Sequence, residues 1–378
     1  MNFWNIKASP TDVVLLRITA VAWFVAKVMS FKLWTADRLF PTIPTFDFLQ
    51  FDNTVHLGLY VISLLGIAVV FLFPSKKIIA TLIIFEILSC LLDQMRWQPW
   101  QFQYLLTFVF FLFAKDRKQF LSLFVLLIGC TYVYSGIHKF DGSFLYTFWD
   151  KLVLTNYLHL DTQTIKMPVV HYLGLVPCLI EIVIGIGIIF FRNKKYFCIA
   201  ALLMHLFIIL IYGPTGTNHN NIIVPWNLAM MLFLLVFIYR KEVPQIQVQF
   251  FRSKLNTAVF ILVGILPILS HFNQWDQYLS FNLYSGNTKI LALCVDDVQQ
   301  YPELEHYAAL TKIDNYCSST HLIKLNNWAL EELKVPVIPE ERAFKKIKEQ
   351  FNAKYPDLKT SFVFNQYPYK KENIQEVE

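Results

Sequence analysis

The sequence predicts an all-α polytopic membrane bundle of about nine transmembrane helices, followed by a small C-terminal α+β domain. Of the 378 residues, 56% are hydrophobic, 16% are aromatic and only 16% are charged. This composition is too apolar for an ordinary soluble enzyme. Apolar runs close to the roughly 20 residues needed to cross a bilayer recur along the first two thirds of the chain, and the remainder has the composition of a soluble domain.

The apolar runs also predict where each helix lies. We expect the membrane domain over residues 1–272 and the α+β domain over 273–378. The expected spans are 12–33, 54–74, 77–94, 99–114, 119–138, 169–191, 195–212, 220–239 and 254–271.

Basic residues predict the orientation of this bundle. One side of the nine spans carries about twice as many Lys and Arg residues as the other, and short loops rich in these residues stay in the cytoplasm. The residues on that side are Lys7, Lys76, Lys77, Lys115, Arg117, Lys118, Arg192, Lys194, Lys195, Arg240, Lys241, Arg252 and Lys254. We therefore expect a protein of the inner membrane with a cytoplasmic N-terminus and a periplasmic C-terminal domain. The net charge of +6 is explained by these loops, so no nucleic-acid partner is expected.

The fifth span ends in an unusual outward segment, HKFDGSFLYTFWDKLVLTNYL (138–158). Its large apolar residues recur at helical spacing, which indicates a helix lying in the membrane interface and covering a cavity. Lys139 would lie at the mouth of that cavity, as a neutral base or as a partner for an anionic group, with His138 beside it and Trp149 against a substrate. A re-entrant hairpin, or an aromatic anchor with a snorkelling lysine, would also explain the pattern.

Two other outward loops contain candidate binding residues. RWQPWQFQY (96–104) has more amides than membrane anchoring needs, so Arg96, Trp97 and Trp100 either face a substrate or pack. GPTGTNHNN (213–221) combines turn residues with His219, which has no Cys, Asp or Glu at ligand spacing. We expect this loop to plug the outer surface, with His219 near a substrate, and we expect no metal site.

Four ionisable residues fall within predicted spans, where a charge needs a partner or water. They are Lys27, Glu86, Glu181 and His205, and Tyr132 and Tyr134 reach similar depths. Buried pairs that fix helix order, such as Lys27 with a glutamate, would explain them. Alternatively they form a polar pocket that moves protons for a lipid-soluble substrate such as a quinone.

The cysteines separate into two groups. Four lie in predicted spans and should pack as small apolar residues, namely Cys90, Cys130, Cys178 and Cys198. Cys294 and Cys317 fall in the outward domain, where we expect a structural disulfide. In the same domain we expect a strand at KILALCV (289–295) and amphipathic helices at LNNWALEELKV (325–335) and PEERAFKKIKEQFNAKYP (339–356).

Two stretches, LLRITAVAWF (15–24) and YVYSGIHKFDGSFLYTFW (132–149), resemble the HTTM domain. This membrane module is shared by vitamin K-dependent γ-carboxylase and many bacterial proteins of unassigned activity. The related DoxX and MauE-like bundles share the G-x-x-K span ending, and several are linked to quinone or thiol redox chemistry. The resemblance covers roughly residues 10–270 and rests on the overall pattern and one short motif.

The resemblance implies a role for one residue. Lys139 matches the position of the catalytic lysine in the carboxylase family, a base that deprotonates a reduced quinone on the lumenal side. The chain lacks the large lumenal region of the carboxylases, and its tail offers no evident propeptide-binding surface. Carboxylation of glutamate is therefore not expected.

These observations leave two classes of function open. In the first, the protein binds a quinone-like or lipid substrate at an outward pocket and performs proton-coupled redox or transfer chemistry, with Lys139, His138, Glu181 and His205 as catalytic candidates and Tyr134 among the binding residues. A quinone is the one cofactor considered. In the second, it is a non-enzymatic scaffold or accessory subunit whose C-terminal domain docks a periplasmic protein. A transporter is a third reading, and the lack of Gly/Pro-interrupted helices in matching halves counts against it.

Overall fold

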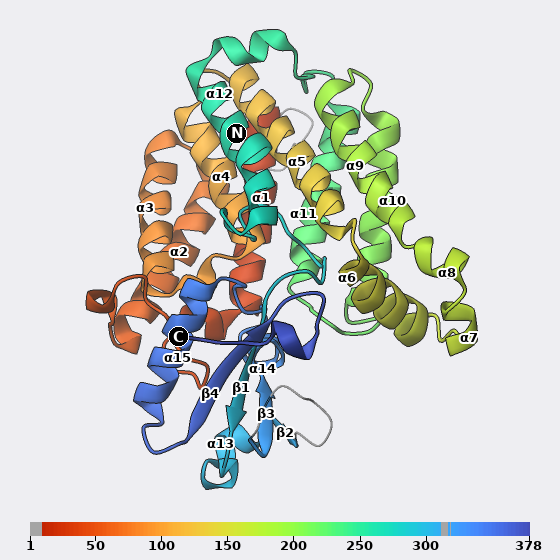
Figure 1. The fold of residues 1–378 in the computed structure, drawn as a ribbon. Helices are drawn as coiled ribbons and strands as arrows, with labels where there is room; N and C mark the ends of the chain where they lie inside the picture. Colours follow the sequence, from red (N-terminus) through yellow and green to blue (C-terminus); the bar gives the residue numbers. More distant parts are fainter. Residues whose placement is uncertain (1–9, 311–316, 318) are drawn as a thin grey trace. The chain divides into compact units, whose positions relative to one another are not determined.

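The computed structural model describes residues 10–310, 317 and 319–378, so Lys7 lies outside the described residues. Contacts group the chain into two compact units (Figure 1). The helical unit comprises Met1–Val28, Ile62–Glu86 and Pro99–Gly286, and the sheet unit comprises Met29–Val61, Ile87–Gln98 and Asn287–Glu378. The boundary predicted after residue 272 divides the chain differently, because the sheet unit also takes in two segments from the first hundred residues.

A helix is present at each of the nine predicted places, and helices form 65% of the structure. They are α1 (Thr11–Met29), α2 (Asn53–Leu72), α3 (Lys76–Leu92), α4 (Pro99–Phe113), α5 (Arg117–Lys139), α8 (Pro168–Tyr172) with α9 (Leu175–Phe190), α10 (Lys195–Tyr212), α11 (Ile223–Tyr239), and α12 (Lys254–Phe260) continued by η6 (Ile261–Ile265) and η7 (Leu266–Phe272).

Five stretches of the described chain are long and apolar enough to cross a membrane, so nine spans are not confirmed. They are Asn53–Leu72, Arg117–Lys139, Pro168–Phe190, Lys195–Tyr212 and Lys254–Phe272. The helices α4 and α11 are apolar but shorter. With 15 residues, α4 extends about 22 Å at roughly 1.5 Å per residue, less than the ~30 Å hydrocarbon thickness.

The segment after α5 is helical, as predicted, but much of it is wound as a π-helix. It contains α6 (Gly142–Phe144), η4 (Leu145–Tyr157) and α7 (Thr162–Ile165). Most π-helices are single-turn bulges, so 13 residues is an unusual length. Leu152, Val153 and Leu154 of η4 pack against Ile211 and Tyr212 of α10. Its position in a membrane interface stays a prediction.

The helices α5 and α9 approach each other closely because glycine lies at their contact. A Cβ atom added at Gly185 would lie 2.5 Å from the backbone oxygen of Gly129 and 2.8 Å from the backbone nitrogen of Val133. A Cβ atom at Gly136 would lie 2.7 Å from the backbone oxygen of Cys178. Small residues of this kind let helix backbones meet inside a bilayer, where van der Waals packing drives association.

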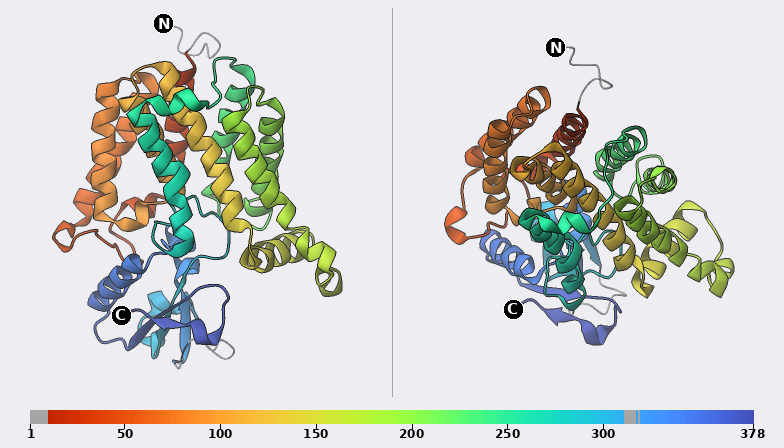
Figure 2. Two further views of the ribbon diagram at one scale, coloured as in Figure 1. Left: turned by 45° about the horizontal axis from the view of Figure 1, so that its top comes forward. Right: turned by 90° about the horizontal axis from the view of Figure 1, so that it is seen from above.

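Contacts gather the basic loops at one end of the helical unit. Lys76 Nζ donates to the backbone oxygen of Ala114 at 2.7 Å, and Arg117 pairs with Asp12 at 3.1 Å. The backbone nitrogen of Ile246 donates to the backbone oxygen of Ile189 at 2.8 Å. In Figure 2, right, the helices of this unit are seen close to end-on. This grouping agrees with the charge asymmetry, and the side of the membrane stays a prediction.

The sheet unit contains the small antiparallel sheet predicted for the C-terminal part. Its strand order is β2-β3-β1-β4-β5. The strands are β1 (Ile290–Val295), β2 (Ala308–Leu310), β3 (His321–Lys324), β4 (Thr360–Asn365) and β5 (Gln375–Glu376), and the helices are α13 (Pro302–Glu305), α14 (Leu325–Glu332) and α15 (Glu341–Lys354). The predicted strand and the two predicted amphipathic helices are confirmed as β1, α14 and α15.

Two segments from the first hundred residues pack within the sheet unit. The Glu332 carboxylate accepts hydrogen bonds from the backbone nitrogens of Leu39 and Phe40 at 2.7 and 2.8 Å. Arg38 pairs with Asp93 at 2.6 Å, and both side chains are fully buried. These contacts join segments 29–61 and 87–98 to α14 and to each other. The unit is therefore assembled from distant parts of the sequence.

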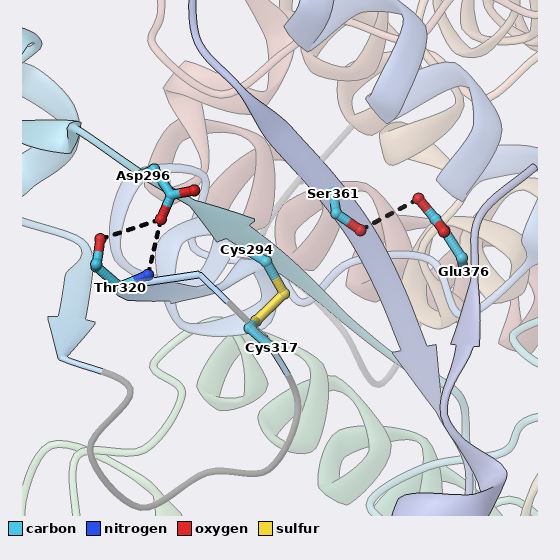
Figure 3. Close-up of a disulfide and its surroundings, with 6 residues drawn as sticks. All are labelled: Cys294, Asp296, Cys317, Thr320, Ser361 and Glu376. Carbon is cyan, nitrogen blue, oxygen red and sulfur yellow. Dashed lines mark hydrogen bonds between the residues drawn. A yellow bond between two sulfur atoms is a disulfide. The ribbon is translucent and has the colours of Figure 1, made fainter.

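Cys294 and Cys317 are joined in a disulfide, as Figure 3 shows. Cys294 lies in the central strand β1, which pairs with both β3 and β4. The bond closes a loop with a sequence separation of 23 residues. It therefore ties this loop to the middle of the sheet.

We predict that Gly185→Leu destabilises the helical unit by about 1–3 kcal/mol or more, because the new side chain must overlap backbone atoms of α5. Thermal unfolding in detergent measures the effect. The control is Gly58→Ala in α2, where an added Cβ meets no atom within 4 Å, and which should leave stability unchanged or raise it by up to about 1 kcal/mol. Equal melting of both variants would contradict the close helix contact.

We predict that the double variant Cys294→Ala/Cys317→Ala loses about 2–4 kcal/mol of stability, because the disulfide restricts the unfolded chain. Thermal unfolding with and without a reductant checks this. The reductant should lower the melting temperature of the wild type and leave that of the variant unchanged. A wild type insensitive to reduction would show that the bond contributes no stability.

Candidate functional site

The helical unit contains a small cavity of about 60 Å³, mostly apolar and bordered by a few polar side chains, which we call the lysine cavity. Four helices and one later segment line it. The lining residues are Thr131, Tyr132, Ser135 and Lys139 of α5, Glu181 of α9, Met204, His205 and Ile208 of α10, Trp226, Asn227 and Met230 of α11, and Leu283 and Tyr284. Because one water occupies roughly 30 Å³ of liquid, the space holds about two waters.

Lys139 is the central charged group of the cavity. Its Nζ atom lies 2.6 Å from Ser135 Oγ and 2.9 and 2.8 Å from the two carboxylate oxygens of Glu181. Ser135 precedes Lys139 by one helical turn, so both side chains lie on the same face of α5. Lys139 is only 9% exposed. The ammonium and the carboxylate therefore neutralise each other in a site largely screened from solvent.

His205 forms a second polar group with Tyr132 and Asn227. The Asn227 amide nitrogen donates to the backbone oxygen of Ile223 at 2.8 Å, which leaves Asn227 Oδ1 to accept from His205 Nδ1 at 2.6 Å. His205 Nε2 then accepts the Tyr132 hydroxyl proton at 2.6 Å. Asn227 thus fixes the tautomer of a neutral imidazole that can receive a proton from Tyr132.

Tyr284 closes part of the cavity wall. Its ring lies 5.6 Å from Phe148 of η4 and 5.5 Å from Tyr212 of α10, and its hydroxyl accepts from Asn220 Nδ2 at 3.1 Å. Burial raises the pKa of Tyr284 and the Asn220 hydrogen bond lowers it, with burial the larger effect, so the phenol stays protonated. A quinone ring is larger than two waters, so it can enter only if lining side chains move aside.

The arrangement can accept and hold a proton. Glu181 is a carboxylate base, and transfer of a proton from Lys139 across 2.8 Å would leave a neutral amine base beside it. An oxyanion formed in the cavity would be stabilised by the Lys139 ammonium. The remaining wall includes Met204, Ile208 and Met230, which keep the local dielectric low.

Three of the four predicted catalytic residues line this cavity, and His138 does not. His138 stacks on His271 of η7 with 4.5 Å between the ring centres, and its Nε2 lies 3.4 Å from Ser270 Oγ. The Tyr134 hydroxyl donates to the backbone oxygen of Gly264 in η6 at 2.5 Å. Both side chains therefore join α5 to the α12–η7 helix.

Trp149 and His219 lie in the predicted lid and plug, outside the cavity lining. Trp149 Nε1 donates to the backbone oxygen of Val170 at 2.9 Å, which ties η4 to α8. His219 packs with its ring 6.3 Å from Phe148 and 6.5 Å from Tyr212. Burial lowers the pKa of His219, so its imidazole is neutral at neutral pH.

Arg96 and Trp97 belong to the sheet unit, and Trp100 belongs to α4. Arg96 is fully buried and donates to the backbone oxygens of Leu33 and Ser89 at 3.1 and 2.7 Å. It also contacts His56 Nδ1 at 2.7 Å. Trp100 packs near Tyr104 with 6.1 Å between ring centres. The contacts of Arg96 are those of a packing residue, one of the two roles considered for it.

Lys27 and Glu86 form a second buried ion pair, at 2.9 Å and with both side chains fully buried. Gln101 donates to the same carboxylate at 3.0 Å, Ser63 donates to it as well, and Trp23 Nε1 donates to Gln101 at 2.6 Å. None of these residues lines the lysine cavity. The four ionisable residues of the spans thus divide into two separate sites.

Sequence reasoning missed Ser135, Asn227 and Tyr284 as site residues. The spacing of Tyr132, Ser135 and Lys139, at three and four residues, places them on one helix face and was a usable signal. Asn227 stands in the apolar run of α11, where a buried amide needs a partner. For Tyr284 the sequence holds no signal, because its place depends on how the segment after η7 folds back.

Among residues 10–310, 317 and 319–378, no group of three His, Cys, Asp or Glu residues could hold a metal ion. No family model, no curated protein and no solved structure matches the chain.

We predict that Lys139 and Glu181 are energetically coupled. Lys139→Met alone should cost about 3–5 kcal/mol, because it leaves a buried carboxylate without its partner. The double variant Lys139→Met/Glu181→Gln should lose less free energy of unfolding than the sum of the two single losses, by about 1–3 kcal/mol. Unfolding of the wild type, both single variants and the double variant in detergent completes the cycle, and strictly additive losses would contradict the pair.

Proposed function

We propose that the protein is an integral membrane protein that binds a lipid-soluble substrate at the lysine cavity and moves a proton on it. The observation that supports this most is the position of Lys139, which lies between Ser135 and Glu181 on the wall of a cavity that also reaches His205. A buried ion pair that serves only stability has no need of such a cavity. The pair Lys27–Glu86 is fully buried and lies outside this cavity.

The substrate class follows from the chemistry of the wall. The cavity offers a carboxylate base, an ammonium, a phenol that donates and a neutral imidazole that accepts, with apolar side chains around them. This set suits a hydrophobic molecule with an acidic hydroxyl, such as a quinol, whose oxyanion Lys139 would stabilise. The resemblance to HTTM domains, in which a matching lysine acts on a reduced quinone, supports the same class.

In the proposed reaction step, the substrate O–H bond breaks and its proton passes to Glu181 or to the neutral Lys139 amine. Tyr132 can pass its own proton to His205 Nε2 while it takes one from the cavity, since the two atoms are 2.6 Å apart. Entry of a ring requires displacement of some of the lining side chains. We place the protein in an inner membrane with the sheet unit in the periplasm, on the basis of its basic loops.

The test compares the two buried ion pairs. Wild type, Lys139→Met/Glu181→Gln and the control Lys27→Met/Glu86→Gln are purified in mild detergent, and their quinones and lipids are measured by mass spectrometry. One quinone or lipid class should be enriched on the wild type and the control, and depleted at least about tenfold on the cavity variant. We expect at least about tenfold because a hydrogen bond to a charged group contributes roughly 1.5–3 kcal/mol, and about 1.4 kcal/mol corresponds to a tenfold change in affinity.

The control matters because both double variants remove a buried lysine–glutamate pair from the same unit. Melting temperatures show whether each variant is folded. Identical bulk lipid on all three proteins would overturn the proposal. It would favour the scaffold reading, in which the sheet unit docks a periplasmic protein.

A further inference from the structure

A second and larger cavity, of about 520 Å³, lies in the helical unit between the loop that begins α5 and the 240–253 loop that precedes α12. We call it the basic pocket. It shares no lining residue with the lysine cavity. Its volume falls within the roughly 300–1,000 Å³ typical of ligand pockets.

Buried amides hold the shape of the basic pocket. Gln119 Nε2 donates to Ser253 Oγ and to Asn256 Oδ1, both at 2.8 Å, and Gln119 Oε1 accepts from the backbone nitrogen of Lys115 at 2.9 Å. Asn256 also donates to the backbone oxygen of Phe250 at 2.9 Å. The two loops are therefore fixed to each other through side-chain hydrogen bonds.

Three cations face this pocket: Lys115, Lys118 and Arg252. Across the part of the chain that the structure describes, no carboxylate forms an ion pair with any of them. The one acidic residue of the lining, Asp116, accepts from the backbone nitrogen of Gln119 at 2.8 Å and so caps α5. Arg117, by contrast, turns away and pairs with Asp12. The pocket keeps a surplus of positive charge.

We propose that the basic pocket binds the phosphate-bearing headgroup of an anionic phospholipid. An arginine and two lysines around a polar cavity match the charge and the oxygen acceptors of a phosphodiester. Basic pockets between membrane helices bind such headgroups on the cytoplasmic side, which is the side that the basic loops predict for this end.

The neighbouring side chains favour a lipid over a soluble phosphate ester. Along η5 (Val248–Arg252), two exposed apolar residues stand next to pocket residues. Val248 is 83% exposed and Phe251 is 43% exposed, whereas Gln249 and Arg252 line the pocket. Exposed apolar groups beside a cationic pocket give acyl chains a surface to contact while the headgroup is bound.

The test uses the full chain in nanodiscs of phosphatidylcholine with a minor fraction of phosphatidylglycerol, and native mass spectrometry counts retained phosphatidylglycerol. The pocket variant is Lys115→Gln/Lys118→Gln/Arg252→Gln. The control is Arg192→Gln/Lys195→Gln/Lys241→Gln, which removes three exposed cations from the same set of basic loops outside the pocket. Each pocket charge should contribute about fivefold to the affinity for phosphatidylglycerol. The pocket variant should therefore bind this lipid roughly 100-fold more weakly, and the affinity of the control should change little.

Two results would overturn the proposal. Equal losses in both variants would show general charge attraction without a site. Competition by glycerol 3-phosphate at the same concentration as phosphatidylglycerol would identify a soluble phosphate ester as the ligand. If the triple variant does not fold, Lys118→Gln and Arg252→Gln alone carry the test, since both side chains are exposed, and each should weaken retention about fivefold.

Discussion

The close contact of α5 with α9 is the constraint on which the candidate site depends. Side chains at Gly136 and Gly185 would overlap backbone atoms of the facing helix. Without glycine at these positions the two helices would separate, and Lys139 on one could not lie 2.8 Å from Glu181 on the other. Van der Waals packing, which is weak for each atom and large in sum, thus brings together two charges that would be costly apart.

Two lysine–glutamate pairs within one unit show how surroundings decide the role of a charge. Lys27 and Glu86 are fully buried, and Gln101 and Ser63 complete the hydrogen bonding of the carboxylate. Neither Lys27 nor Glu86 lines the lysine cavity. Lys139 and Glu181 instead border open space that reaches a histidine. Chemistry needs an accessible volume as well as a reactive group.

Much of the helical pattern could be predicted from the sequence, because apolar runs of span length and helix termini are local signals. The tail helices α14 and α15 and the strand β1 were likewise local. Nine complete spans were not confirmed, since α4 is too short to cross the hydrocarbon. Pairing in the site was harder to predict, because Tyr284 and Asn227 meet the other residues through folding of distant segments. Arg96 illustrates the limit, since a polar-rich loop has the same composition whether it binds a ligand or fills a core.

The assembly of the sheet unit from distant segments has a consequence for synthesis. The backbone nitrogen of Leu39 donates to Glu332, which is synthesised 293 residues later. At roughly 5–20 residues per second, the ribosome takes about 15–60 s to cover that distance. During this interval the loop after α1 has emerged while the helix that satisfies it does not yet exist. Until translation is almost complete, the backbone nitrogens of this loop must therefore be hydrogen-bonded to water or be covered by a chaperone.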